Sequence, residues 1–290
     1  MTRGALLLAA GLFLSCGDSL SGETHTVVFT ELTFGVRDPD QQVDGQDVSS
    51  GLDIDGHVST RRDVEGCNRQ DFVNADGTPG IDNQFTFLFE AIEEIFPGAV
   101  EGLIQGTINE GRLLLMLRLD GVDDFQNDDH VELSTFIGEG RPDLSAADRI
   151  VPDQTFDIKA DSPISRATGR IVDGVLEAGP FTFEFPVAVL NVFFDMTVMD
   201  SVLRAEISED GSIRGIFGGG VPMEQIQNVG LMADAMQEIQ ISPTLDLLLP
   251  RLVDLGKGED GRCTLVSANM IFESTPAFVF DTPAPVVEDE

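Results

Sequence analysis

The fold class is decided by residues 181–217, which read FTFEFPVAVLNVFFDMTVMDSVLRAEISEDGSIRGIF. The first five residues place phenylalanine at every second position, a period of two that is typical of a strand with one buried face. Further on, two strand-like runs, 201–207 and 212–217, flank Ser208-Glu209-Asp210-Gly211, which is a strong turn signal. The stretch therefore predicts antiparallel strands that are joined by hairpins.

Strand-like runs continue on both sides of this stretch. We expect further strands at 26–36, 112–119, 131–137, 170–177, 263–273 and 277–280, and helices at 85–96, 99–109, 222–239 and 242–255. The three glycines at 218–220 are expected to break the chain before the third helix. Because the strands outnumber the helices and follow one another as hairpins rather than as strand–helix–strand crossovers, the sequence predicts a mainly β (α+β) fold with antiparallel, sandwich-like sheets and a few packed helices.

One segment does not fit this regular pattern. Residues 37–83 are rich in Asp, Gly and Ser and show little periodicity. Such a length is unusual for a loop inside a compact domain. The segment is therefore either functional or contains short strands, such as one at 52–58.

Composition limits the partners. The chain has 290 residues, of which 42% are hydrophobic, and carries 51 acidic against 17 basic residues for a net charge of −34. That charge repels phosphate backbones and anionic lipid surfaces, so we expect no nucleic acid partner and no electrostatic attachment to a membrane. The hydrophobic content is enough for a core in one large domain.

The first residues predict export. Residues 1–15 combine Arg3 with an apolar run, as in a signal peptide, and the run ends in LFLSC, which resembles the bacterial lipobox with Cys16 as the lipidated residue. We expect a tether at 16–23, a single β-rich domain at 24–280 with a sub-division considered near residue 150, and a disordered acidic tail at 281–290. The predicted location is the bacterial cell envelope, with a lipid anchor as the contact with the membrane.

The other two cysteines form an even pair. If Cys16 carries lipid, Cys67 and Cys263 remain, and an exported protein meets an oxidising compartment. The sequence favours a disulfide between them, and the alternative is two separate buried thiols.

One passage carries a resemblance. Residues 66–84 read GCNRQDFVNADGTPGIDNQ. With the upstream LDIDGHVS of residues 52–59, this resembles a group of uncharacterised predicted lipoproteins and exported proteins of soil and marine bacteria. The resemblance covers residues 51–140 best and implies no known activity.

The same passage suggests a cation. Its carboxylate and amide oxygens, together with two neighbouring acidic clusters, are the ligands that calcium prefers, and Gly77 and Gly80 allow tight turns. The candidate metal ligands are Asp53, Asp55, Asp71, Asn74, Asp76, Asp82, Asn83, Asp123, Asp128 and Asp129. The spacing is not that of an EF-hand. The alternative is a set of solvated turns in which Asp side chains accept hydrogen bonds from nearby backbone.

Two functions remain open. The first is a non-catalytic lipoprotein with a structural or binding role, stabilised by calcium. The second is an exported hydrolase with an acidic or metal-assisted site around His57, Asp76, Asp82 and Asp129. A transition-metal site that pairs His57 and His130 with Asp55 and Asp129 is a further hypothesis. No enzyme signature motif is present, so the sequence favours the first function.

Overall fold

The computed structural model describes residues 22–64, 66–95, 97–189, 192–236 and 240–280. The predicted signal peptide, Cys16, the acidic tail and most of the predicted tether lie outside these ranges. Among the described residues, no helix has the length and apolar character needed to cross a bilayer.

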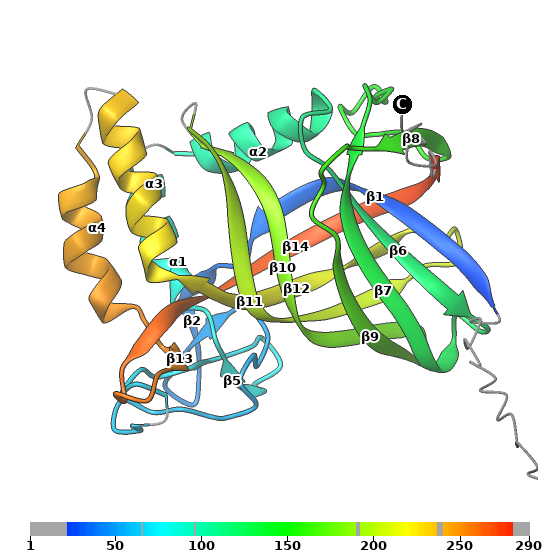
Figure 1. Ribbon diagram of the computed structural model, residues 1–290. Coiled ribbons are helices and arrows are strands. Elements are labelled where there is room, and N and C mark those ends of the chain that lie inside the picture. Colours follow the sequence, from blue (N-terminus) through cyan, green and yellow to red (C-terminus); the bar gives the residue numbers. More distant parts are fainter. Residues whose placement is uncertain (1–21, 65, 96, 190–191, 237–239, 281–290) are drawn as a thin grey trace, which may run out of the picture.

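The principal sheet closes on itself. Eight antiparallel strands each pair with two neighbours, so that their order returns to its start (Figure 1). In ring order they are β1 (Glu23–Phe34), β6 (Leu114–Val122), β7 (Asn127–Glu139), β9 (Ser165–Val172), β10 (Val175–Val189), β11 (Val192–Ile207), β12 (Ile213–Pro222) and β14 (Cys263–Phe280). The prediction of a mainly β fold with antiparallel, sandwich-like sheets is confirmed, and the arrangement is barrel-like because both edges of the sandwich are joined.

Two short strands extend the ring. β8 (Gln154–Ile158) pairs with the end of β7 and, in parallel, with the last residues of β14. β13 (Leu255–Lys257) pairs with the beginning of β14. Strands from both sides of residue 150 therefore belong to the same sheet.

Phenylalanines fill the core of the ring. Phe29 and Phe272 stack with ring centroids 4.4 Å apart, and Phe217 packs edge-on against Phe183 at 5.2 Å. All four side chains are buried. The alternation of phenylalanine at the start of β10 thus places apolar side chains inside the ring, as the period of two predicts.

The helices cover the ring at its ends. α1 (Phe85–Ile95) and α2 (Ala99–Asn109) follow each other, and α2 packs against β1 and β10. α3 (Met223–Met236) packs against β11 and β12, and α4 (Ser242–Leu248) lies beside it (Figure 1). The helix predicted at 242–255 is shorter than expected, because Pro250 falls in a 3-10 turn (Leu249–Arg251) that ends it.

The segment without periodicity contains a second, small sheet. β2 (Arg37–Val43), β3 (Gln46–Ser49), β4 (Phe72–Val73) and β5 (Pro79–Ile81) form it in that order. The segment therefore does contain short strands, but residues 52–58 are not one of them.

Two local predictions were wrong. Residues 170–177 are a hairpin rather than one strand, because Asp173 and Gly174 adopt φ angles of 51° and 77° that suit a two-residue turn. The three glycines at 218–220 do not break the chain, because they continue β12 in register with β14. Their lack of side chains allows close packing instead: a Cβ at Gly218 would lie 2.2 Å from Asn269 Oδ1.

Candidate metal centre

The acidic segment, residues 51–84, is held against the ring by an asparagine. Asn269 lies on β14, is 1% exposed, and donates from Nδ2 to the backbone oxygen of Asp82 at 2.6 Å. Its Oδ1 accepts a hydrogen bond from Leu52 N at 3.0 Å. The space that Gly218 leaves is therefore occupied by the side chain that fixes both ends of this segment.

A disulfide fixes the same segment at a second point. Cys67 is bonded to Cys263 at the beginning of β14, with a Cα–Cα distance of 6.1 Å and a sequence separation of 196. The predicted disulfide is confirmed, and the alternative of two separate thiols is wrong. The crosslink keeps the loop around Cys67 close to the strand that also carries Asn269.

Three carboxylates converge within this segment. One oxygen each of Asp53, Asp55 and Asp82 lies within 4.8 Å of the other two, a geometry that can hold a metal ion. Backbone N–H groups orient the side chains: Gly56 N donates to Asp53 at 2.7 Å, His57 N to Asp55 at 2.8 Å, and Ile54 N to Asp82 at 2.7 Å. Asp82 is 2% exposed, whereas the other two carboxylates reach solvent, so the cluster lies at the surface with a buried base.

Two further buried acids lie next to the cluster. Asp71 accepts a hydrogen bond from Ser59 N at 2.5 Å, and Asp254 accepts hydrogen bonds from Ser267 N at 2.9 Å and from its hydroxyl at 2.5 Å. Both aspartates are less than 5% exposed. No ion pair joins an arginine or lysine to any of the five acids within the described part of the chain.

Without a bound cation, the ionised state of the buried carboxyl groups at this cluster is unfavourable. Burial, and then the charges of Asp254 and Asp71, raise the pKa of Asp82 to about 9. Burial also raises the pKa of Asp71 to about 7 and that of Asp254 to about 7, in both cases with a contribution from Asp55. The first cause is desolvation and the second is mutual repulsion, and a bound cation would oppose both.

Asn74 and Asp76 form a plain turn instead. Asn74 Oδ1 accepts hydrogen bonds from the backbone of Asp76 at 3.1 Å and of Thr78 at 3.0 Å. Asp76 accepts a hydrogen bond from the Thr78 hydroxyl at 2.7 Å, which lowers the pKa of this exposed carboxyl. These side chains follow the alternative interpretation of turns closed by their own backbone.

Asn83 makes structural hydrogen bonds. It is 1% exposed, and its Nδ2 donates to the backbone oxygen of Gly35 at 2.8 Å and to the Ser49 hydroxyl at 2.9 Å. Its amide thereby joins the small sheet to the end of β1.

The third predicted cluster lies in the acidic turn, residues 120–130, between β6 and β7. Asp128 accepts hydrogen bonds there from Asp123 N at 2.7 Å and from His130 N at 3.0 Å. Asp129 lines a cavity of about 790 Å³ together with Asp53 and Asp76, but it is not part of the cluster. The structure therefore brings together only part of the predicted ligand set.

The histidines are engaged separately. His57 lies 2.8 Å from Asp63 through Nε2, and this hydrogen bond raises the pKa of the exposed imidazole. Within the described ranges, the one group of three or more metal-binding side chains at this proximity does not include His57, His130, Asp76 or Asp129. The hydrolase and the transition-metal site stay predictions, without a geometric observation in their favour.

Sequence reasoning missed Asp254. It lies between apolar neighbours in the run LVDL of residues 252–255, and an acid in such a run is a signal of burial. Ser267 and Asn269 give the same kind of signal within the otherwise apolar strand β14. These three residues lie late in the sequence and contribute to the buried side of the acidic segment.

The chain matches no protein-family model, no curated protein and no solved structure.

Proposed function

We propose that this chain is an exported, lipid-anchored protein of the bacterial cell envelope with a non-catalytic structural or binding role, and that calcium stabilises its acidic segment. The observation that carries the calcium proposal is the convergence of Asp53, Asp55 and Asp82 without a basic partner among the described residues. Asp71 and Asp254 add two more buried carboxyl groups at the base of this cluster.

The ligand chemistry favours calcium over other metals. All the converging groups are carboxylates, and hard oxygen ligands select calcium or magnesium rather than zinc or copper. Three carboxylates supply up to six oxygens, and the spread of the oxygens over 4.8 Å suits the larger and more flexible coordination shell of calcium. Backbone oxygens and water would complete the shell.

Export and anchoring have independent support. The disulfide between Cys67 and Cys263 agrees with folding in an oxidising compartment. The lipobox-like run that ends at Cys16 supplies the attachment point. We also propose that the chain belongs with the exported proteins that it resembles, because the residues that carry this resemblance include Cys67, Asp71 and Asp82.

Calcium binding is tested by isothermal titration calorimetry on the EDTA-treated mature protein. We expect one saturable site for calcium, weaker binding of magnesium, and loss of the site in Asp55→Asn, whose side chain is exposed and tolerates the change. The matched control is Asp123→Asn, which removes the same charge from the acidic turn and should bind like the wild type. Equal binding by both variants would contradict the proposal.

The anchor is tested in cells. Labelling with a palmitate analogue should mark the wild type and leave Cys16→Ser unlabelled. Equal labelling of the two would show that Cys16 carries no lipid, and the calcium proposal would be unaffected.

A further inference from the structure

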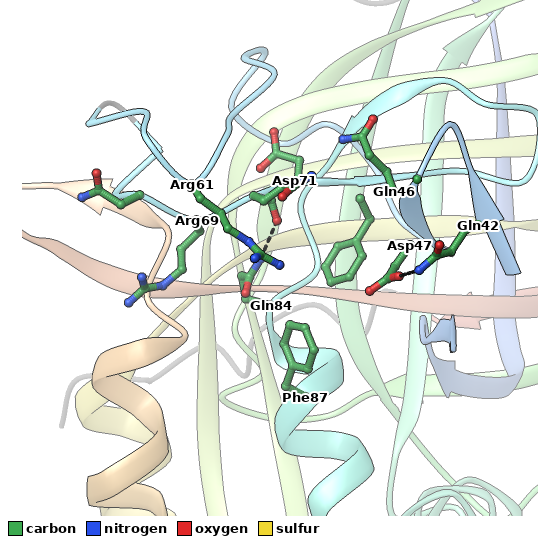
Figure 2. A pocket seen from close by; sticks show the side chains of 12 residues that line it. Gln42, Gln46, Asp47, Arg61, Arg69, Asp71, Gln84 and Phe87 are labelled. Carbon is green, nitrogen blue, oxygen red and sulfur yellow. Dashed lines mark hydrogen bonds between the residues drawn. The ribbon is translucent and has the colours of Figure 1, made fainter. Parts of the chain in front are cut away.

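A cavity of about 520 Å³ lies beside the acidic segment. It is bordered by the hairpin of β2 and β3, by Arg61 and residues 68–72, and by the beginning of α1 (Figure 2). Its wall includes Gln42, Gln46, Arg61, Arg69, Gln84 and Phe87. The cavity shares Asp71 with the base of the acidic cluster, but none of the three converging carboxylates lines it.

Two arginines and two aspartates line this cavity. They are Arg61, Arg69, Asp47 and Asp71. Figure 2 shows the Arg61 side chain reaching in the direction of Gln84. Its guanidinium makes no hydrogen bond or ion pair with another described residue, so its donors are free for a ligand.

Arg69 supplies a fixed second charge. Its Nη2 donates to the backbone oxygen of Pro250 at 3.1 Å, which holds the side chain in place. Its Nε is buried and has no acceptor in the described part of the chain, which leaves an unmet hydrogen bond at the wall of the cavity.

The acids at the cavity are already engaged. Asp47 accepts hydrogen bonds from Gln42 Nε2 at 2.8 Å and from Arg37 at 3.4 Å. Asp71 accepts its hydrogen bond from Ser59 N. The free charged group at this cavity is therefore the guanidinium of Arg61.

The rest of the wall offers amides and one exposed aromatic ring. Gln42, Gln46, Gln70 and Gln84 can donate to and accept from hydroxyl groups. Phe87 is 36% exposed, and its ring centroid lies 5.8 Å from that of the buried Phe72 behind it. Such a wall fits a ligand with hydroxyl groups and one apolar ring face.

We propose that this cavity binds a hydroxylated organic acid of the uronic-acid type, with its carboxylate on Arg61, its hydroxyl groups on the glutamine amides and its ring on Phe87. A planar carboxylate matches the donor fork of a guanidinium. A doubly charged phosphate would meet stronger repulsion from a chain of net charge −34. The proposal is independent of calcium.

The test is isothermal titration calorimetry at low ionic strength in EDTA, so that a failure of the calcium proposal does not affect the result. D-glucuronate, D-glucose and inorganic phosphate serve as probes. We expect glucuronate to bind, and glucose and phosphate to bind at least about tenfold more weakly, as the loss of a charge-assisted hydrogen bond implies. Arg61→Gln should weaken glucuronate about tenfold or more.

Arg62→Gln is the matched control. Arg62 is exposed and next in sequence, but it does not line the cavity, so this variant should bind glucuronate like the wild type. Unchanged melting temperatures of both variants would show that they are folded. The proposal is overturned if glucuronate does not bind, if glucose or phosphate binds as tightly, or if Arg61→Gln and Arg62→Gln bind alike.

Discussion

The acidic segment and the acidic turn have the same kind of sequence but different structures. Both are dense in aspartate, and both were expected to supply metal ligands. In the acidic turn, Asp128 accepts hydrogen bonds from the backbone of Asp123 and His130, so the turn satisfies its own groups. In the acidic segment, Asp82 is buried beside acids that come from three other parts of the chain.

The difference shows that the density of aspartate does not define a site. The acidic segment is docked on β14 through Asn269 and the disulfide, and its carboxylates at Asp71 and Asp82 are buried. In the acidic turn, Asp123, Asp124 and Asp129 stay exposed to solvent. The desolvation of charge, and the need for a cation that follows from it, thus come from tertiary structure.

Removal of the disulfide should have the largest effect. We expect Cys67→Ala/Cys263→Ala to lose about 4 kcal/mol of unfolding free energy, because the bond closes a long loop in the unfolded chain. Urea denaturation measures this loss, and hydrogen exchange locates it. Exchange should accelerate in the acidic segment and stay unchanged in the acidic turn. Equal acceleration in both would mean that the disulfide does not support the cluster specifically.

The second prediction concerns pH. The pKa of Asp82 is raised from 3.8 to about 9, so the folded state binds an extra proton between these values. Its contribution to stability is therefore complete below pH 4 and is lost as pH rises toward 9. In EDTA, the unfolding free energy should fall by a few kcal/mol, an order-of-magnitude estimate, from pH 5 to pH 8.5. Asp71 and Asp254 contribute in the same direction up to pH 7.

Asp82→Asn isolates this contribution. The neutral side chain keeps the shape without the buried charge, so we expect a flatter pH dependence, measured by urea denaturation at both pH values. A variant with the same slope as the wild type would show that another group is responsible.

The third prediction concerns the docking contact. Asn269→Ala leaves Leu52 N and the oxygen of Asp82 without their partner, which should cost about 1–3 kcal/mol. Asn127→Ala is the counterpart in the acidic turn, where an exposed Asn127 accepts one hydrogen bond from Asp173 N. This control should change the unfolding free energy by less than about 0.5 kcal/mol. Similar losses of unfolding free energy in both variants would contradict the proposed difference between the acidic segment and the acidic turn.

The smallest effect is expected for Asp128→Asn. Burial opposes the charge of Asp128, but backbone N–H groups of His130, Asp123 and Asp124 outweigh it and lower the pKa. Its contribution is present above its unfolded pKa and is lost as pH falls, which is opposite in sign to Asp82. We expect a loss of about 0.5–1 kcal/mol at pH 7 and none at pH 3, measured by urea denaturation. A loss that grows toward low pH would contradict this assignment.

Much of the β structure could be predicted from local patterns. The alternating phenylalanines and the turn at 208–211 gave the β10–β12 meander, and the helical spacing at 85–96 and 99–109 gave α1 and α2. The closure of the ring could not be predicted, because it depends on pairing of β1 with β14 and of β7 with β9, which are distant in sequence. The glycines of β12 do not break the chain because Gly218 makes room for Asn269, and Gly219 and Gly220 allow close packing against Val198 and Leu265.

Only some of the site residues could be predicted from the sequence. The clustering of aspartates in the sequence pointed to Asp53, Asp55, Asp71 and Asp82, but it also pointed to Asp123 and Asp128. Asp254 has no such motif, and only its apolar neighbours mark it. Burial and convergence separate these residues, and both arise from contacts between distant parts of the chain.

The most direct test of the account is the melting temperature of the mature protein in calcium and in EDTA at pH 8. A saturating calcium concentration of about 100 times Kd should raise the melting temperature by about 5–10 °C, and Asp82→Asn should not respond. The same melting temperature in calcium and in EDTA, or an equal rise in wild type and Asp82→Asn, would contradict a calcium site at this cluster.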